Sequence, residues 1–139
     1  MEWNKKYDRF EQCSPIPSPK IKVKVGLLRD VHNNFGVNCK GDFSTETIDA
    51  IADTGCQTTT SGIGLLNILG MSENMLVPTK HRIVGITDTR LEIIGSVFIR
   101  IQYNDATTRQ MVHISRNSSG LYLSEHACKE LNIVHPEFP

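Results

Sequence analysis

Residues 50–55 read Ala-Ile-Ala-Asp-Thr-Gly, and this short run is the sharpest local feature of the sequence. An apolar stretch leads directly into an acidic residue, a small hydroxyl residue and a glycine. A carboxylate at the end of a buried strand is costly unless something compensates for its burial. A second carboxylate that shares one proton compensates, because two like charges about 3 Å apart cannot both ionise. Such a pair can act as base and acid on one water molecule.

Two residues after Asp53 fit the same interpretation. The hydroxyl of Thr54 can brace the loop, and Gly55 permits a tight turn and a close backbone approach. The alternative is an ordinary β-turn, because all three residue types are common in turns. The apolar residues before Asp53 favour the functional interpretation, since turns usually follow a polar strand end. The plain turn stays open at this point.

Composition limits the other function classes. The chain has 139 residues, 39% of them hydrophobic, which is enough for one core. Fifteen basic and fifteen acidic residues give a net charge of zero, so no electrostatic footprint for nucleic acid or an anionic membrane is expected. We expect no cofactor and no metal, because no phosphate-loop motif is present and none of the five histidines has a metal-ligand spacing.

The cysteines predict a reducing compartment. The four are Cys13, Cys39, Cys56 and Cys128, and no two form a C-x-x-C motif. The first twenty residues are polar and contain no apolar signal region, and no stretch is long and apolar enough to span a membrane. We therefore expect reduced thiols and a cytoplasmic location.

The pattern along the chain predicts a flexible tail or linker over residues 1–19 and one domain over residues 20–139. Ile21, Val23 and Val25 alternate with lysines, which is typical of a half-buried strand. Further strands are predicted over residues 44–52, 80–86, 91–103 and 107–115. Turns are predicted at residues 32–36, 38–42, 87–90 and 104–106.

Helical signals are few. Residues 61–78 contain several glycines and predict a looser stretch with short helical turns at 65–69 and after Ser72. A helix is predicted over residues 124–132, with Ser124 as its N-cap and an apolar stripe at helical spacing. Successive hairpins without alternating helices predict an all-β fold, a small closed β-barrel with one short C-terminal helix.

Three segments together resemble a known family. They read AIADTGCQTTTSG at residues 50–62, HRIVGITDTRLEIIGSVFIRIQY at 81–103 and GLYLSEHACKELNIVHPEFP at 120–139. They resemble the retropepsin-like aspartic proteases, and more narrowly the protease region of invertebrate LTR-retrotransposon Pol polyproteins. The resemblance implies the retropepsin-like acid protease fold and a homodimeric endopeptidase that processes a Gag-Pol polyprotein.

The resemblance also implies roles for single residues. Asp53 would be the catalytic aspartate, Thr54 the residue whose hydroxyl bonds across the dimer, and Gly55 the turn glycine beside the water. A mobile flap that binds substrate would include Ile83, Val84, Gly85 and Ile86, although these residues also fit an ordinary hairpin.

The sequence departs from the family pattern at two places. An apolar-apolar-Gly segment usually precedes the last helix, and the corresponding position here reads Ser118-Ser119-Gly120, whereas Ile93-Ile94-Gly95 predicts a bulged core strand. Cys56 stands where alanine is usual, either as a small buried residue or as a site of redox sensitivity. The family's dimer interleaves its chain ends, for which residues 20–25 and 132–138 are the candidates.

Chain length makes the dimer a requirement of the catalytic hypothesis. No second Asp-Ser/Thr-Gly exists, since Asp88-Thr89 is followed by Arg90. A second chain must therefore supply the other aspartate, and a twofold dimer does so. Two alternatives stay open: a catalytically degenerate dimerisation or interaction module of the same fold, and a cellular retropepsin-like domain of the ubiquitin-receptor type. The lack of a ubiquitin-like segment weighs against the second.

Overall fold

The first strand, β1 (Lys20–Leu27), follows the alternation of its sequence. Val23 and Val25 are buried, and the alternating Lys22 and Lys24 are exposed. The second strand, β2 (Glu46–Ala52), pairs antiparallel with β1 along most of its length. Its last residue, Ala52, is buried and stands directly before Asp53.

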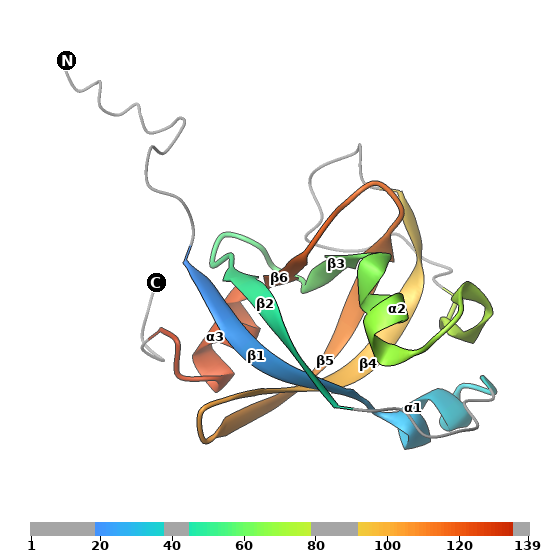
Figure 1. The fold of residues 1–139 in the computed structure, drawn as a ribbon, viewed down its shortest axis with the longest axis horizontal. Helices are drawn as coiled ribbons and strands as arrows, with labels where there is room; N and C mark the ends of the chain where they lie inside the picture. The colour runs from blue at the N-terminus through green and yellow to red at the C-terminus, as the bar shows by residue number, and fades with distance from the viewer. Residues whose placement is uncertain (1–18, 38–44, 79–91, 135–139) are drawn as a thin grey trace, which may run out of the picture.

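The computed structural model describes residues 19–37, 45–78 and 92–134. Within them, six strands close into a barrel in the order β1-β2-β6-β3-β5-β4 (Figure 1). The other strands are β3 (Thr60–Gly62), β4 (Ile93–Tyr103), β5 (Ala106–Ser115) and β6 (Leu121–Leu123). The predicted all-β closed barrel is confirmed.

Two parallel pairings distinguish this barrel from a simple meander. The long β4–β5 hairpin and the β1–β2 and β1–β4 pairs are antiparallel, whereas β6 pairs parallel with β2 and β3 pairs parallel with β5. Short β3 and β6 also pair with each other. Through β6, the end of β2 meets the segment that leads into the last helix, so the Asp-Thr-Gly turn lies against the C-terminal part of the chain.

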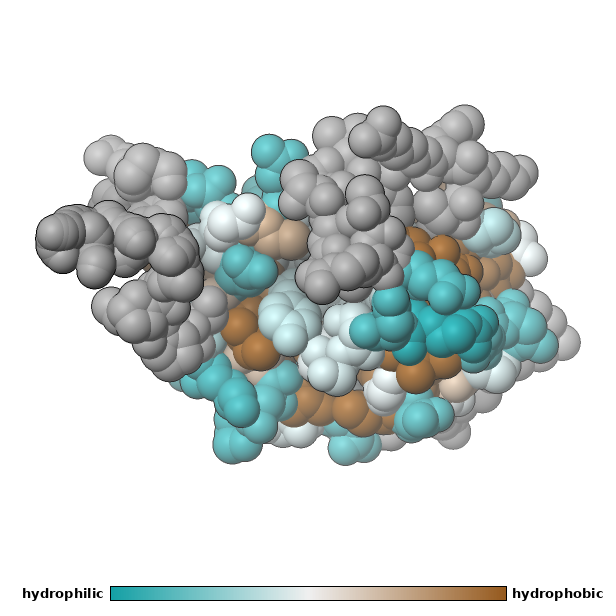
Figure 2. All heavy atoms as spheres, turned by 90° about the horizontal axis from the view of Figure 1, so that it is seen from above, coloured by the Kyte–Doolittle hydropathy of each residue, from teal (hydrophilic) through white to brown (hydrophobic). Residues whose placement is uncertain are grey.

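The barrel interior is filled by aliphatic side chains from five of the strands and from two helices. Its largest fully buried members include Ile99, Ile101, Ile114, Leu121 and Leu123. Seen from above, the surface shows apolar residues between hydrophilic ones (Figure 2). Within the described ranges, no helix is long and apolar enough to cross a membrane.

Besides the expected C-terminal helix, the described residues contain three further short helices. The structure has α1 (Arg29–Asn34), α2 (Gly64–Leu69), the 3-10 helix η1 (Glu73–Met75) and α3 (Glu125–Glu130). The short helical turns expected at 65–69 and after Ser72 are confirmed, but α1 occupies much of the segment predicted as a turn at 32–36. The tertiary fold overrides local propensity there, because His32 is fully buried and its Nε2 accepts a hydrogen bond from the Phe98 N–H (2.9 Å).

Helix α3 begins as the sequence predicts. The Ser124 side chain accepts a hydrogen bond from the Ala127 N–H (3.2 Å), which confirms the N-cap. The helix ends at Glu130, two residues earlier than expected, and Asn132 then adopts a positive φ of 60°.

Some strand predictions hold and others were missed. β4 and β5 match the predicted 91–103 and 107–115 closely, and a register shift between Ile93 and Gly95 confirms the bulge. β3 and β6 were not predicted, because three residues are too few to show an alternation. The predicted tail up to Ser18, the turn at 38–42, the strand at 80–86 and the hairpin tip at 87–90 lie outside the described residues.

Candidate active site

The Asp-Thr-Gly segment forms a tight turn at the end of β2. The Cys56 N–H donates to the Asp53 carbonyl (3.0 Å) and closes the turn. Asp53 and Thr54 are partly buried, and Gly55 is exposed. A Cβ placed on Gly55 would lie 3.7 Å from Asp53 Oδ1, an ordinary contact, so the carboxylate lies close over the glycine. Among the described residues, no close contact and no positive φ requires glycine at this position.

Residues 123–125 hold the loop of residues 53–59 at its start, middle and end. The Asp53 N–H donates to the Leu123 carbonyl (3.0 Å), and the Glu125 N–H donates to the Cys56 carbonyl (3.0 Å). The Ser124 N–H donates to Thr59 Oγ1 (3.1 Å). Residues 53–59 are therefore fastened to the junction between β6 and α3.

No hydrogen bond or ion pair joins the Asp53 carboxylate to another side chain of the described residues. Its negative charge acts on the thiol of Cys128, which is fully buried. Burial first, then the negative charges of Asp53 and Glu125, raises the pKa of the Cys128 thiol to about 11, so the thiol stays protonated.

A polar chain, buried except at Glu130, runs from the loop to the far end of α3. Thr59 Oγ1 lies 3.1 Å from Ser124 Oγ and 3.2 Å from Gln110 Oε1. Gln110 Nε2 donates to Thr108 Oγ1 (2.8 Å), and the Thr108 hydroxyl donates to Glu130 Oε1. Sequence reasoning identified Ser124 only as a helix cap and missed the other members, although the run Thr58-Thr59-Thr60 after the turn was an available signal.

The structure also corrects one position of the sequence interpretation. The residues directly before α3 are Leu121–Leu123, which form β6, followed by Ser124. Ser118-Ser119-Gly120 lies earlier, in the loop between β5 and β6, so it is not the segment that leads into the helix. The apolar residues Leu121 and Leu123 therefore precede α3, with Ser124 between them and the helix.

The structure describes some of the predicted site residues and not others. Asp53, Thr54 and Gly55 lie together in one turn, whereas the flap residues Ile83, Val84, Gly85 and Ile86 lie outside the described residues. The described ranges contain no cluster of three or more His, Cys, Asp or Glu side chains that could hold a metal ion. Cys56 is partly buried, and its Sγ donates to the Thr58 carbonyl (2.8 Å).

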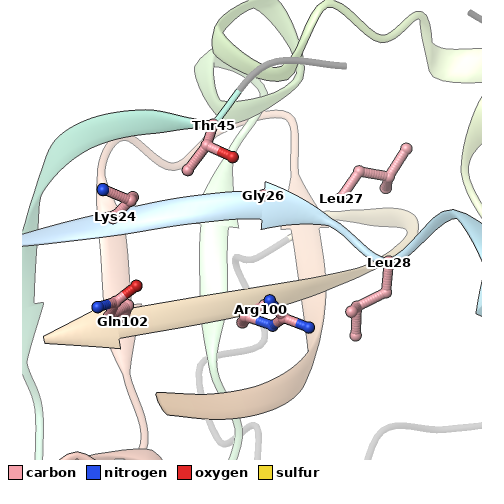
Figure 3. A pocket seen from close by; sticks show the side chains of 7 residues that line it. All are labelled: Lys24, Gly26, Leu27, Leu28, Thr45, Arg100 and Gln102. Carbon is pink, nitrogen blue, oxygen red and sulfur yellow. The ribbon is translucent and has the colours of Figure 1, made fainter. Parts of the chain in front are cut away.

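A hollow of about 250 Å³ lies on the outer face of the barrel (Figure 3). Its lining residues are Lys24, Gly26, Leu27, Leu28, Thr45, Arg100 and Gln102. Thr45 precedes β2 and Asp53 follows it, so the hollow and the Asp-Thr-Gly turn lie at opposite ends of that strand. A strand of seven residues spans about 23 Å, so the hollow does not belong to the candidate active site.

Comparisons with known proteins do not assign the chain to a family. No protein-family model and no curated protein sequence matches this chain. Among solved structures, it is similar to the "Crystal structure of retroviral protease-like domain of Ddi1 from Leishmania major". The identity is 12%, the TM-score is 0.48, and the match covers 82% of this chain and 77% of that chain. Function must therefore be argued from the site itself.

Proposed function

We propose that this chain is one half of a homodimeric aspartic endopeptidase. The observation that carries the proposal is the Asp53 carboxylate, partly buried on a tightly fastened turn at the end of β2, with no partner among the described side chains. The sequence resemblance over residues 50–62, 81–103 and 120–139 supports the same conclusion.

The proposed mechanism needs two copies of the turn. Twofold symmetry would bring Asp53 next to Asp53 of a second chain, and the pair would share one proton. The ionised carboxylate would take a proton from a water molecule held between the two, and that water would attack the scissile carbonyl. The protonated carboxyl would donate its proton toward the carbonyl oxygen as the tetrahedral intermediate forms.

Thr54 and Gly55 have supporting roles in this proposal. The Thr54 hydroxyl, which is bonded to no described residue, would bond across the dimer and hold the two turns together. The exposed Gly55 leaves room for substrate backbone beside the Asp53 carboxylate. The proposed substrate is an extended peptide, and the resemblance makes a Gag-Pol polyprotein the best candidate.

Peptide cleavage by the whole chain tests the proposal. The purified protein is incubated with a complex peptide mixture at mildly acidic pH, and new termini are identified by mass spectrometry. Asp53→Asn should abolish cleavage. Asp49→Asn is the matched control, because Asp49 lies on the same strand but is exposed and forms an ion pair with Lys22 (2.7 Å).

The same experiment separates the rival functions. A folded, dimeric wild-type protein without cleavage would favour the interaction module and overturn the enzymatic proposal. Cleavage that persists in Asp53→Asn would show that another group is responsible. Loss of cleavage in both variants would point to a general defect of the preparation, which a circular dichroism spectrum of each variant detects.

A further inference from the structure

The polar chain described above has one consistent direction. Glu130 ends it, and an ionised carboxylate can only accept hydrogen bonds, so the Thr108 hydroxyl must donate to it. Thr108 then accepts from the Gln110 amide NH₂, which turns Gln110 Oε1 toward Thr59. Because Oε1 only accepts, the single proton of the Thr59 hydroxyl is directed to Gln110.

This assignment determines how Thr59 meets α3. With its proton used, Thr59 Oγ1 accepts from both the N–H and the hydroxyl of Ser124, each at 3.1 Å. Ser124 Oγ still accepts the Ala127 N–H (3.2 Å). Thr59, Ser124 and Gln110 are 1%, 2% and 8% exposed, so water cannot replace these bonds readily.

Thr59 is thus the one residue shared by the candidate catalytic loop and the buried chain. The loop begins at Asp53, which bonds to Leu123, and it ends at Thr59. Thr59 bonds to Ser124, the residue that follows Leu123. The Thr59 carbonyl also accepts the His113 N–H (3.0 Å), so its backbone is tied to β5. Thr59 therefore links β5, through its backbone, to the start of α3, through its hydroxyl, at the end of the loop that begins with Asp53.

We infer that Thr59 is a positioning residue, whose hydroxyl orders the loop that carries Asp53 through the directed chain Ser124–Thr59–Gln110–Thr108–Glu130. This inference rests on the proposed peptidase function. It assigns no contact between Thr59 and substrate. The chain joins the first and last turns of α3, so it holds that helix and the loop as one unit.

The test compares three variants of the whole chain. Thr59→Val keeps the shape of the side chain and removes the hydroxyl, whereas Thr59→Ser keeps the hydroxyl. Ser61→Ala is the matched control, because Ser61 is also buried on this segment but its hydroxyl bonds only to the Gly62 carbonyl (3.1 Å). Steady-state kcat and KM are corrected for the folded fraction of each protein.

Thr59→Val should lower kcat by about 10- to 100-fold, the loss expected when a catalytic group is displaced by a fraction of an ångström to one ångström. KM should change less than about threefold, because substrate contacts are retained. Thr59→Ser should recover kcat to within about threefold of wild type, and Ser61→Ala should match wild type. Equal kcat in Thr59→Val and Ser61→Ala would overturn the inference.

A second measurement keeps the inference testable if the protein is not a peptidase. Amide hydrogen exchange reports the Asp53 N–H bond to Leu123 directly. Faster exchange at Asp53 in Thr59→Val, but not in Ser61→Ala, would support positioning even when wild type shows no cleavage. Unchanged exchange would overturn it. If Thr59→Val does not fold, Gln110→Met replaces it, because that change removes the acceptor of the Thr59 proton.

Discussion

The backbone N–H of Asp53 donates a hydrogen bond to the carbonyl of Leu123 (3.0 Å), joining the end of β2 to the end of β6. The bond continues the parallel pairing in which Ala52 lies opposite Leu123. Asp53 is thereby placed by backbone geometry, and no described side chain bonds to its carboxylate. The C-terminal part of the chain therefore acts as the base on which the Asp-Thr-Gly turn rests.

A mixing experiment tests whether the active centre is shared between two chains. Wild type and Asp53→Asn are combined at a constant total concentration and allowed to exchange subunits. If both aspartates are needed, activity should follow the square of the wild-type fraction, about one quarter at equal amounts. A linear decrease would contradict the shared centre. Sedimentation should give a mass of twice 15.6 kDa under the same conditions.

Gly62 should not tolerate a side chain. A Cβ there would lie inside the van der Waals contact distance of the Ser118 carbonyl oxygen and 2.9 Å from Ser118 C and Ser119 Cα. These are backbone atoms, so Gly62→Ala should lower the free energy of unfolding by about 3 kcal/mol. Urea unfolding of the variant and of wild type measures this difference in the free energy of unfolding.

Gly64→Ala is the control for this change. Nothing lies within 4 Å of a Cβ at Gly64, which is the exposed first residue of α2. Its stability should equal or slightly exceed that of wild type. Equal stability of the two alanine variants would show that β3 and the 118–119 backbone are not in close contact.

His32 should make the fold sensitive to acid. Burial lowers the pKa of His32 from its ordinary value of 6.5, and the Met75 backbone opposes the shift only in part. The unfolded chain therefore binds more protons once the pH falls below about 6.5, so the stability that neutral His32 contributes is present above this pH and decreases below it. Protonation would also put a hydrogen on His32 Nε2. That nitrogen could then no longer accept the hydrogen bond from the Phe98 N–H.

His32→Gln isolates this contribution. The variant keeps an acceptor for Phe98 but cannot titrate, so its free energy of unfolding should fall less steeply between pH 7 and pH 5. The difference in slope should be at most about 1.4 kcal/mol per pH unit, which corresponds to one proton. His113, whose pKa is also lowered by burial, acts in the same direction and is present in both proteins. Identical slopes would refute the role of His32.

Cys128 should resist alkylation in the folded protein. It is fully buried, and its thiol pKa of about 11 leaves little thiolate at neutral pH. Iodoacetamide treatment followed by peptide mass mapping should leave Cys128 unmodified while the partly exposed Cys56 reacts. In denaturant both should react. Rapid labelling of native Cys128 would show that α3 opens easily.

Much of the barrel could be predicted because local pattern and final structure agree there. The alternation at Val23 and Val25 and the long β4–β5 hairpin carry their own periodicity, and Ser124 is a helix cap by residue type alone. The missed elements lack such signals. β3 and β6 have three residues each, and α1 is stabilised by the burial of His32 rather than by helix propensity.

The candidate site, too, was predictable from the sequence only in part. The sequence by itself determined that Asp53, Thr54 and Gly55 form one turn after an apolar strand, because the three are neighbours in the chain. Only the tertiary structure decided what holds that turn. Leu123, Ser124 and Glu125 reach it through the pairing of β6 with β2, and Gln110 reaches it through β5. Contacts between residues far apart in the sequence depend on how the barrel closes, and no local pattern records that closure.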